Sequence, residues 1–183
     1  TLAAMNESNR RSPIVVTSAG ALTQKTVDRD TFISSLHTLH RGQHIDPEKL
    51  LEQWRHVGYD FQSTVYAPGV ASRRGGILDI YSMDWSLPAR VEFWGNDIDS
   101  IRLFDPDTQR SEGVVNSIKI VPARETLPDL TSRVHLDSLM GLVDFSNCSE
   151  VTEGRMREEL ELLLDGQTVE DLSFYSGFFN RGC

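Results

Sequence analysis

Hydrophobic and polar residues alternate with a period of two from Phe61 to Val121, the spacing typical of half-buried β-strands. Glycine and asparagine or aspartate-proline pairs interrupt the alternation and supply turns, at residues 75–76, 95–96 and 105–107. The pattern therefore predicts six strands. They span residues 62–66, 70–72, 77–81, 90–94, 97–104 and 114–121.

Apolar residues recur at helical spacing just before this region. Asp46 suits the N-cap position, Pro47 the first turn and Gly58 the stop, so a helix is predicted over residues 47–57. Its apolar stripe consists of Leu50, Leu51, Trp54 and Val57. This helix and the strands together predict an α+β unit with a mainly antiparallel sheet.

Weaker patterns flank this unit. Residues 14–17 are an apolar run that predicts a short buried strand, and residues 18–22 predict a turn into a helix or a loop. A second helix is predicted over residues 30–39, followed by a linker at 41–44. After Pro122 the apolar residues suggest helical or mixed structure. They are Pro128, Leu136, Leu139, Met140, Leu142, Met156, Leu160, Leu163 and Leu164.

Strand parity divides the fourth predicted strand into two faces. Val91 and Phe93 share the side that suits a hydrophobic core, while Arg90 and Trp94 share the other side. Arg74 begins the neighbouring strand. Tryptophan and arginine are the residues most enriched in binding hot spots, so this side is a candidate docking surface. On the pattern alone, packing of Trp94 beneath a neighbouring helix is an open alternative.

Composition favours a globular protein with protein partners. The chain has 183 residues, 39% of them hydrophobic, and its net charge of -9 argues against nucleic-acid binding through bulk electrostatics. Cys148 and Cys183 fit neither a metal-ligand spacing nor a disulfide scaffold, which favours a reducing cytoplasm. The sequence has no apolar run of membrane-spanning length and no secretion leader, and its start at Thr1 suggests a piece of a longer protein.

The motifs of common catalytic sites are missing from the sequence. His40 and His44 have the spacing of a helical metal pair, but Gly42 lies between them in the predicted linker and a third ligand is lacking. The glycine pair at 75–76 has neither the spacing nor the following helix of a phosphate-binding loop. We therefore expect this chain to be no enzyme, to bind no metal or cofactor, and not to hydrolyse ATP.

Glu92 and Asp99 are candidates for a pair of facing carboxylates. If the hairpin loop at 95–96 has two residues, Glu92 and Asp99 face each other across it, and paired carboxylates can perform acid–base chemistry. Arg90 and Arg102 are close enough to neutralise such a pair. We favour the structural interpretation, because the segment supplies neither a nucleophile nor a pocket.

The segment RGGILDIYSMDWSLPARVEFWGNDIDSIRLFDPDTQRS at residues 74–111 resembles the bacterial transcription-repair coupling factor family (Mfd), whose N-terminal region is homologous to UvrB. Its ending, FDPDTQRS, favours this family over UvrB itself. The resemblance extends to IVVTSAGAL at 14–22, RGQHIDPEKLLEQWRHVGY at 41–59 and SIKIVPARETLP at 117–128. It includes VEDLSFYSGFFN at 169–180 with weaker identity.

The resemblance implies three parts. Residues 1–40 would end a first UvrB-like subdomain, residues 41–124 would form an inserted UvrA-binding subdomain, and residues 125–183 would begin the returning UvrB-like subdomain. The outer parts would be incomplete segments of a motor-fold domain that has lost its ATP site. The implied fold class is therefore α/β, with the α+β unit as its insertion.

In this family the inserted subdomain binds UvrA, the damage-recognition ATPase of nucleotide excision repair. The family's contact residues align onto Arg74, Arg90 and Trp94, the last in place of a usual phenylalanine. The implied function is a non-catalytic, cytoplasmic module that recruits UvrA to stalled transcription complexes. Other domains of the parent chain are implied partners, and the parent's ATP-driven motor and its contacts to RNA polymerase and DNA would lie outside these residues.

Two alternatives are kept open at this point. One is the corresponding fragment of UvrB, in which the same subdomain also binds UvrA. The other is a DNA-contacting module, and its arginines would be Arg10, Arg11, Arg73 and Arg74. The acidic pI of about 5.0 weighs against the second alternative.

Overall fold

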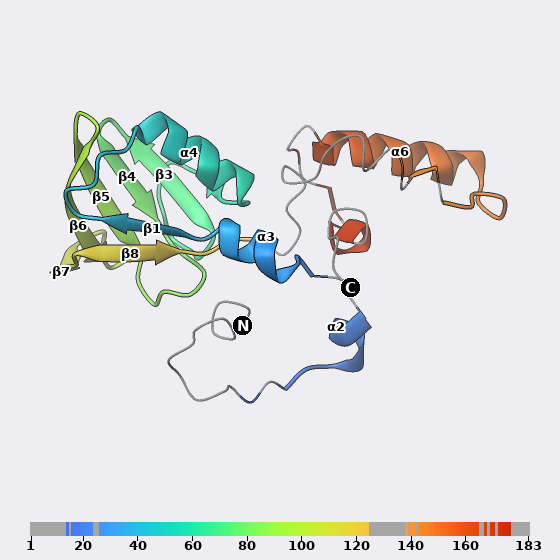
Figure 1. The fold of residues 1–183 in the computed structure, drawn as a ribbon, viewed down its shortest axis with the longest axis horizontal. Coiled ribbons are helices and arrows are strands. Elements are labelled where there is room, and N and C mark those ends of the chain that lie inside the picture. The colour runs from blue at the N-terminus through green and yellow to red at the C-terminus, as the bar shows by residue number, and fades with distance from the viewer. Residues whose placement is uncertain are drawn as a thin grey trace.

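The structure is a computed structural model that describes residues 14, 16–23, 26–124, 138, 140–141, 143–164, 167, 169–170 and 172–176 (Figure 1). In chain order the elements are α2 (Ala19–Thr23), α3 (Arg29–Ser34), β1 (His37–His40), α4 (Pro47–His56), β2 (Asp60–Phe61), β3 (Val70–Arg74), β4 (Ile77–Ile80), β5 (Ala89–Trp94), β6 (Asp97–Phe104), β7 (Ser111–Val114), β8 (Ser117–Ile120), α6 (Glu150–Leu164) and a 3₁₀ turn (Leu172–Tyr175).

Six strands form one sheet in the order β2-β3-β4-β5-β6-β7. The β2–β3 pair is parallel and every other neighbouring pair is antiparallel. β1 and β8 pair with each other as a separate antiparallel ribbon. The predicted α+β unit with a mainly antiparallel sheet is confirmed.

Two glycines set the tight hairpins of this sheet. Gly75 joins β3 to β4 and Gly95 joins β5 to β6, with φ angles of 62° and 61°. The pairs that close these loops are Arg74 with Ile77 and Trp94 with Asp97, so each loop has two residues. A positive φ at the first loop residue matches the right-handed twist of the flanking strands, and glycine adopts it without strain.

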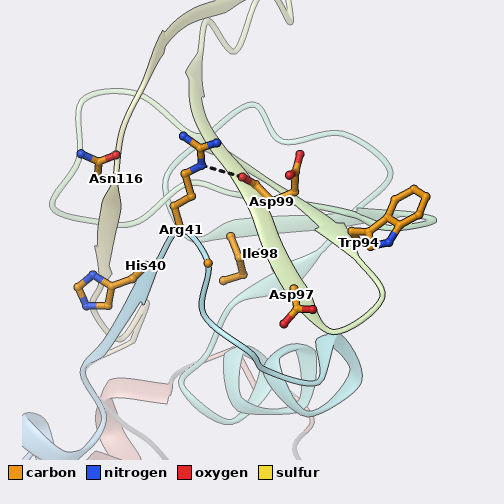
Figure 2. Close-up of a pocket in the computed structure, with 8 residues that line it drawn as sticks. His40, Arg41, Trp94, Asp97, Ile98, Asp99 and Asn116 are labelled. Carbon is orange, nitrogen blue, oxygen red and sulfur yellow. Dashed lines mark hydrogen bonds between the residues drawn. The ribbon is translucent and has the colours of Figure 1, made fainter.

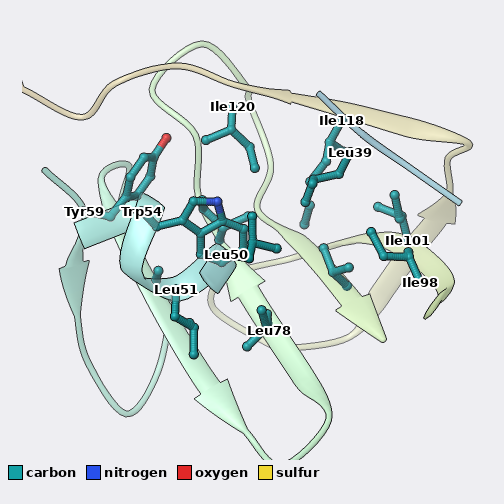
Figure 3. Packing of buried hydrophobic residues seen from close by; sticks show 14 of the residues in the cluster. Leu39, Leu50, Leu51, Trp54, Tyr59, Leu78, Ile98, Ile101, Ile118 and Ile120 are labelled. Atoms are coloured by element: carbon teal, nitrogen blue, oxygen red, sulfur yellow. The ribbon is translucent and has the colours of Figure 1, made fainter. Parts of the chain in front are cut away.

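Helix α4 and the β1–β8 ribbon cover one face of the sheet (Figures 1 and 3). The helix starts as predicted, because the Asp46 carboxylate accepts a hydrogen bond from the Glu48 N–H at 2.9 Å and Pro47 occupies the first turn. It packs Trp54, which is fully buried, into a core shared with the sheet and the ribbon. The members from the ribbon are Leu39, Ile118 and Ile120.

Among the residues that the structure describes, the opposite face of the sheet is covered only at one end. Val65, Val70 and Phe104 form a small buried cluster there. The predicted strand at residues 62–66 is wrong, because the chain leaves the sheet after Phe61 and buries Val65 against this second face. The rest of the second face carries polar side chains, and it contains the candidate site.

A register shift distinguishes β6 from a regular strand. Glu92 pairs with Ser100 and Phe93 with Ile98, so Asp99 is an extra residue on β6. The bulge turns Ile98 to the same side as Ile101, three positions away, and both lie in the main core. The predicted Glu92–Asp99 pair is therefore wrong.

Other predicted boundaries also change. The helix expected over 30–39 ends at Ser34, since residues 37–40 form β1 and pair with β8. The strand expected over 114–121 is two strands, which separate where the chain passes from the sheet to the ribbon. The strand expected at 14–17 is wrong: in this partly described segment, Ile14 and Val16 lie outside any strand and are almost fully exposed.

The described residues beyond Arg124 include a smaller apolar cluster. Leu160 and Leu163 on α6 are buried together with Tyr175, which confirms the helical spacing predicted for this region. Pro128, Leu136, Leu139 and Leu142 lie outside the described residues. Among the residues that are described, no helix is both long and apolar enough to cross a membrane.

Candidate functional site

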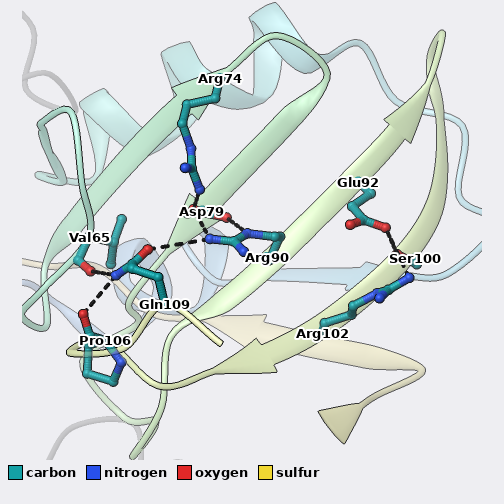
Figure 4. A network of polar contacts seen from close by, with 9 residues as sticks. All are labelled: Val65, Arg74, Asp79, Arg90, Glu92, Ser100, Arg102, Pro106 and Gln109. Atoms are coloured by element: carbon teal, nitrogen blue, oxygen red, sulfur yellow. Dashed lines mark hydrogen bonds and ion pairs between the residues drawn. The ribbon is translucent and has the colours of Figure 1, made fainter. Parts of the chain in front are cut away.

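The polar side of the sheet, opposite α4, carries a cluster of charged residues from four adjacent strands (Figure 4). We call it the arginine face and define it by Arg74 on β3, Asp79 on β4, and Arg90 and Arg102 on β5 and β6. Asp79 lies directly opposite Arg90 in the β4–β5 register. The hydrogen-bonded sheet therefore brings together side chains that are up to 28 positions apart, from Arg74 to Arg102.

Asp79 is the centre of this cluster. Its side chain is only 1% exposed. Its Oδ1 accepts a hydrogen bond from Arg90 Nε at 2.8 Å, and its Oδ2 accepts from Arg90 Nη2 at 2.9 Å and from Arg74 Nη2 at 2.8 Å. A buried carboxylate is tolerated only when it is paired and hydrogen-bonded, and both oxygens of Asp79 meet that condition.

Arg90 is held on several sides. Its guanidinium forms the two-pronged contact with Asp79, lies 4.5 Å from the centre of the Phe104 ring, and is 3.5 Å from Gln109 Oε1. The hydrogen bonds to Asp79 raise the pKa of Arg90. Only 14% of this side chain is exposed. The prediction that Arg90 points away from the core side is correct, but its guanidinium lies against the sheet and is not extended into solvent.

Gln109 reaches this position because of the turn after β6. The Asp105 carboxylate accepts hydrogen bonds from the backbone N–H groups of Thr108 and Asp107, which lowers the pKa of Asp105. Gln109 follows with a φ of 61°, an unusual value for a residue other than glycine. Its side-chain amide donates to the carbonyls of Pro106 and Val65 at 2.7 and 3.2 Å. The turn thereby places Gln109 over one edge of Arg90.

Arg74 is the accessible arginine of the cluster. Its side chain is 53% exposed, and within the described part of the chain only its Nη2 has a hydrogen-bond partner, Asp79. Most of its donors therefore face solvent. Arg102 pairs instead with Glu92 at 3.5 Å, and Glu92 also accepts a hydrogen bond from the Ser100 hydroxyl. The expected neutralisation of Glu92 by Arg102 is confirmed, whereas Arg90 pairs with Asp79.

Trp94 ends β5 beside the Gly95 turn and is 83% exposed. On the other side of the strand Val91 is fully buried and Phe93 packs against the core, as strand parity predicts. Figure 2 shows the Trp94 ring projecting from the end of the strand, at the rim of an open groove. The other residues that line this groove are His40, Arg41, Gly42, Asp97, Ile98, Asp99 and Asn116.

Comparison with known proteins identifies the unit that carries this face. Residues 36–125 match the model of a family described as the UvrB interaction domain. These residues belong to the UvrB interaction domain family. Most of the chain is similar to proteins named transcription-repair-coupling factor: it is 32% identical to that of Bacillus subtilis (strain 168) over 179 residues and 33% identical to that of Myxococcus xanthus over 176 residues.

These alignments cover 93% and 94% of this chain but only 15% and 14% of the two relatives. The transcription-repair-coupling factor of Escherichia coli (strain K12) is 30% identical over 112 residues, which are 61% of this chain and 10% of that protein. The chain thus spans a small part of the relatives it matches. Their name agrees with the resemblance of residues 74–111 to the coupling factors.

Within the UvrB interaction domain, the three residues predicted from the sequence to bind a partner have different surroundings. They are Arg74, Arg90 and Trp94. Asp79 brings Arg74 and Arg90 together. Trp94 follows Arg90 by four residues in β5, about 13 Å along an extended strand. Sequence reasoning missed Asp79 and Gln109. Asp79 could have been noticed as the one carboxylate inside the apolar run ILDI. The position of Gln109 depends on how its turn folds, and no sequence pattern indicated it.

Two further candidate residues, His44 and Arg73, have structural partners. His44 Nδ1 lies 2.8 Å from Asp97 Oδ1, so it has a local hydrogen-bond partner. Among the described residues, no group of three or more His, Cys, Asp or Glu side chains could hold a metal ion. Arg73 pairs with Glu48 on the helix-covered side, whereas Arg74 lies on the arginine face, so the two do not form one basic surface. Arg10 and Arg11 lie outside the described residues.

Proposed function

We propose that the UvrB interaction domain of this chain binds UvrA through Arg74, Arg90 and Trp94, and that it thereby recruits UvrA to stalled transcription complexes for nucleotide excision repair. The observation that carries this proposal is the combination of a highly exposed tryptophan on β5 with an accessible arginine that a buried carboxylate holds. Rigid aromatic and arginine anchors are the usual centre of protein interfaces.

Trp94 offers a large apolar area to a partner. A tryptophan can bury about 150–250 Å² at an interface, which corresponds to roughly 4–6 kcal/mol at about 25 cal/mol per Å² before the costs of association. Trp94 is 83% exposed, so most of this area is available to a partner.

The charge of the arginine face suggests what the partner presents. Arg74 and Arg90 together carry two positive charges and Asp79 one negative charge, while Arg102 and Glu92 neutralise each other. The face is thus locally cationic on a chain with a net charge of -9. Such a surface is complementary to acidic side chains, which would steer the encounter and fix the orientation of UvrA.

We also propose that the module acts without catalysis. ATP hydrolysis, DNA translocation and contact with RNA polymerase are assigned to other regions of a longer coupling factor, and no cofactor is assigned to this chain. The interaction unit would begin with β1 at His37 and not at residue 41, because β1 pairs with β8 and Leu39 belongs to the main core. The flanking parts, up to residue 36 and from residue 125, would be segments of the UvrB-like motor fold.

Isothermal titration of the chain with purified UvrA tests this proposal. We expect a saturable complex that Arg74→Ala weakens. Arg157→Ala is a matched control, because its side chain is 55% exposed, forms one ion pair and lies outside residues 36–125. The proposal fails if the chain does not bind UvrA, or if the two substitutions have the same effect on binding.

A further inference from the structure

We propose that Asp79 is a positioning residue for the docking surface: its buried carboxylate holds the guanidinium groups of Arg74 and Arg90 in one fixed arrangement before the partner binds. This inference rests on the proposed function of the arginine face. Asp79 itself would not touch the partner, because its side chain is 1% exposed and both of its oxygens are occupied by arginine donors.

The strand register explains how one carboxylate reaches two arginines. Asp79 lies in the centre of β4, directly opposite Arg90 on β5 and directly opposite Ser72 on β3. Arg74 is two positions beyond Ser72, so it is the diagonal neighbour of Asp79 on the same side of the sheet. Figure 4 shows both guanidinium groups converging on the carboxylate from the two neighbouring strands.

Stability alone is a weak reason for this arrangement. Replacing a buried ion pair by apolar side chains of similar size is often neutral or stabilising. The neighbours of Asp79 along β4, Leu78 and Ile80, are apolar and fully buried, and the adjacent Phe104 cluster is apolar as well. Apolar side chains in place of both Asp79 and Arg90 would therefore suit the fold, whereas only a carboxylate at position 79 fixes two arginines by charge-assisted hydrogen bonds.

Fixing the arginines matters because arginine has many rotamers. A rotamer-rich side chain loses conformational freedom when an interface immobilises it, and a side chain that is already held loses less. Arg90 is restrained by Asp79, by the Phe104 ring and by Gln109, while among the described residues Arg74 is restrained only by Asp79. Loss of the carboxylate should consequently release Arg74 completely and loosen Arg90.

The test combines binding with a direct measurement on the arginines. We expect Asp79→Asn to weaken binding to purified UvrA by about tenfold, as two released side chains would require. In a chain that already carries Arg74→Ala and Arg90→Ala, adding Asp79→Asn should cause no further loss. Glu48→Gln is the matched control, because Glu48 pairs with Arg73 on the helix-covered side, and it should leave affinity within twofold.

The second readout needs no partner. In ¹H–¹⁵N spectra, the Nε–H signal of Arg90 should exchange slowly with water in the parent chain and rapidly after Asp79→Asn. If Asp79→Asn lowers the melting temperature too far for the titration, Asp79→Asn combined with Arg90→Gln removes both charges of the buried pair. It should bind UvrA more weakly than Arg90→Gln does alone, because Asp79 no longer holds Arg74.

Three results would overturn the inference in distinguishable ways. Parent-like affinity of Asp79→Asn, with Arg74→Ala impaired, refutes positioning and leaves the proposed function intact. An equal loss from Asp79→Asn in the parent and in the double arginine variant means that Asp79 acts by another route. Failure of all arginine substitutions to affect binding removes the docking surface itself, and the inference falls with the proposed function.

Discussion

Two substitutions on β5 separate its core side from its exposed side. Val91 is fully buried and pairs with Leu78 on one side and Ile101 on the other, both fully buried as well. Val91→Ala removes two methyl groups at about 0.8 kcal/mol each and leaves a cavity, so we expect a loss of about 2–3 kcal/mol in unfolding free energy. Trp94 is highly exposed, and Trp94→Ala should change unfolding free energy by no more than about 0.5 kcal/mol.

Calorimetry and urea titration of both variants provide the measurement. For a unit of this size, the loss expected for Val91→Ala corresponds to a fall in melting temperature of roughly 10–20 °C. Phe93→Ala should lie between the two variants or close to Val91→Ala, since Phe93 is half-buried against the core. If Trp94→Ala destabilises the unit by more than about 1 kcal/mol while Val91→Ala does not, the assignment of the two faces is inverted.

The purified chain should show no ATPase activity, and turnover that co-purifies with the chain through a second, unrelated purification step would contradict this. It should bind duplex DNA only at non-specific levels at physiological salt, with Kd above roughly 10⁻⁵ M, because its net charge is -9; sub-micromolar binding would favour the DNA-contacting alternative. Burial lowers the pKa of the His37 imidazole below its ordinary value of 6.5. As the pH falls, His37 is therefore protonated at a higher pH in the unfolded chain than in the folded chain. The unfolding free energy should consequently decline as the pH falls below about 6.5. His37→Phe should remove that part of the pH dependence, and an unchanged slope would refute it.

Local sequence signals predicted the hairpins of this fold well. Gly75 and Gly95 each open a two-residue loop, and the strands on either side follow the expected alternation except at the Asp99 bulge in β6. Such turns depend on the conformational freedom of one residue and need no tertiary information. The same holds for α4, where Asp46 and Pro47 define the start of the helix.

The predicted strands were wrong where the chain leaves one sheet or pairing strand for another. Residues 62–66 contain apolar side chains at strand spacing, yet Val65 packs on the second face against Phe104, which lies 39 positions further along. The run from 114 to 121 looks continuous, but β7 pairs with β6 and β8 pairs with β1. A hydrophobic period of two shows that successive side chains alternate between the two faces of a sheet. It does not show which neighbouring strand each segment pairs with.

The sequence likewise predicted only part of the candidate site. Alternation along β5 placed Trp94 opposite Val91 and Phe93 without any knowledge of the sheet. The clamp between Asp79 and its two arginines depends on the order and register of three strands, so strand parity could not reveal it. The bulge at Asp99 is a further tertiary feature, and it replaced the expected Glu92–Asp99 pair with Glu92 and Ser100.

The affinity of Trp94→Ala for UvrA tests the central claim most directly. Phe174→Ala is the control, because Phe174 is also a largely exposed aromatic residue, at 67%, and lies outside residues 36–125. Titration calorimetry should show a loss of about 2 kcal/mol or more for Trp94→Ala, roughly thirtyfold in Kd, and less than a twofold change for Phe174→Ala. Parent-like affinity of Trp94→Ala, with the fold intact, would contradict the account.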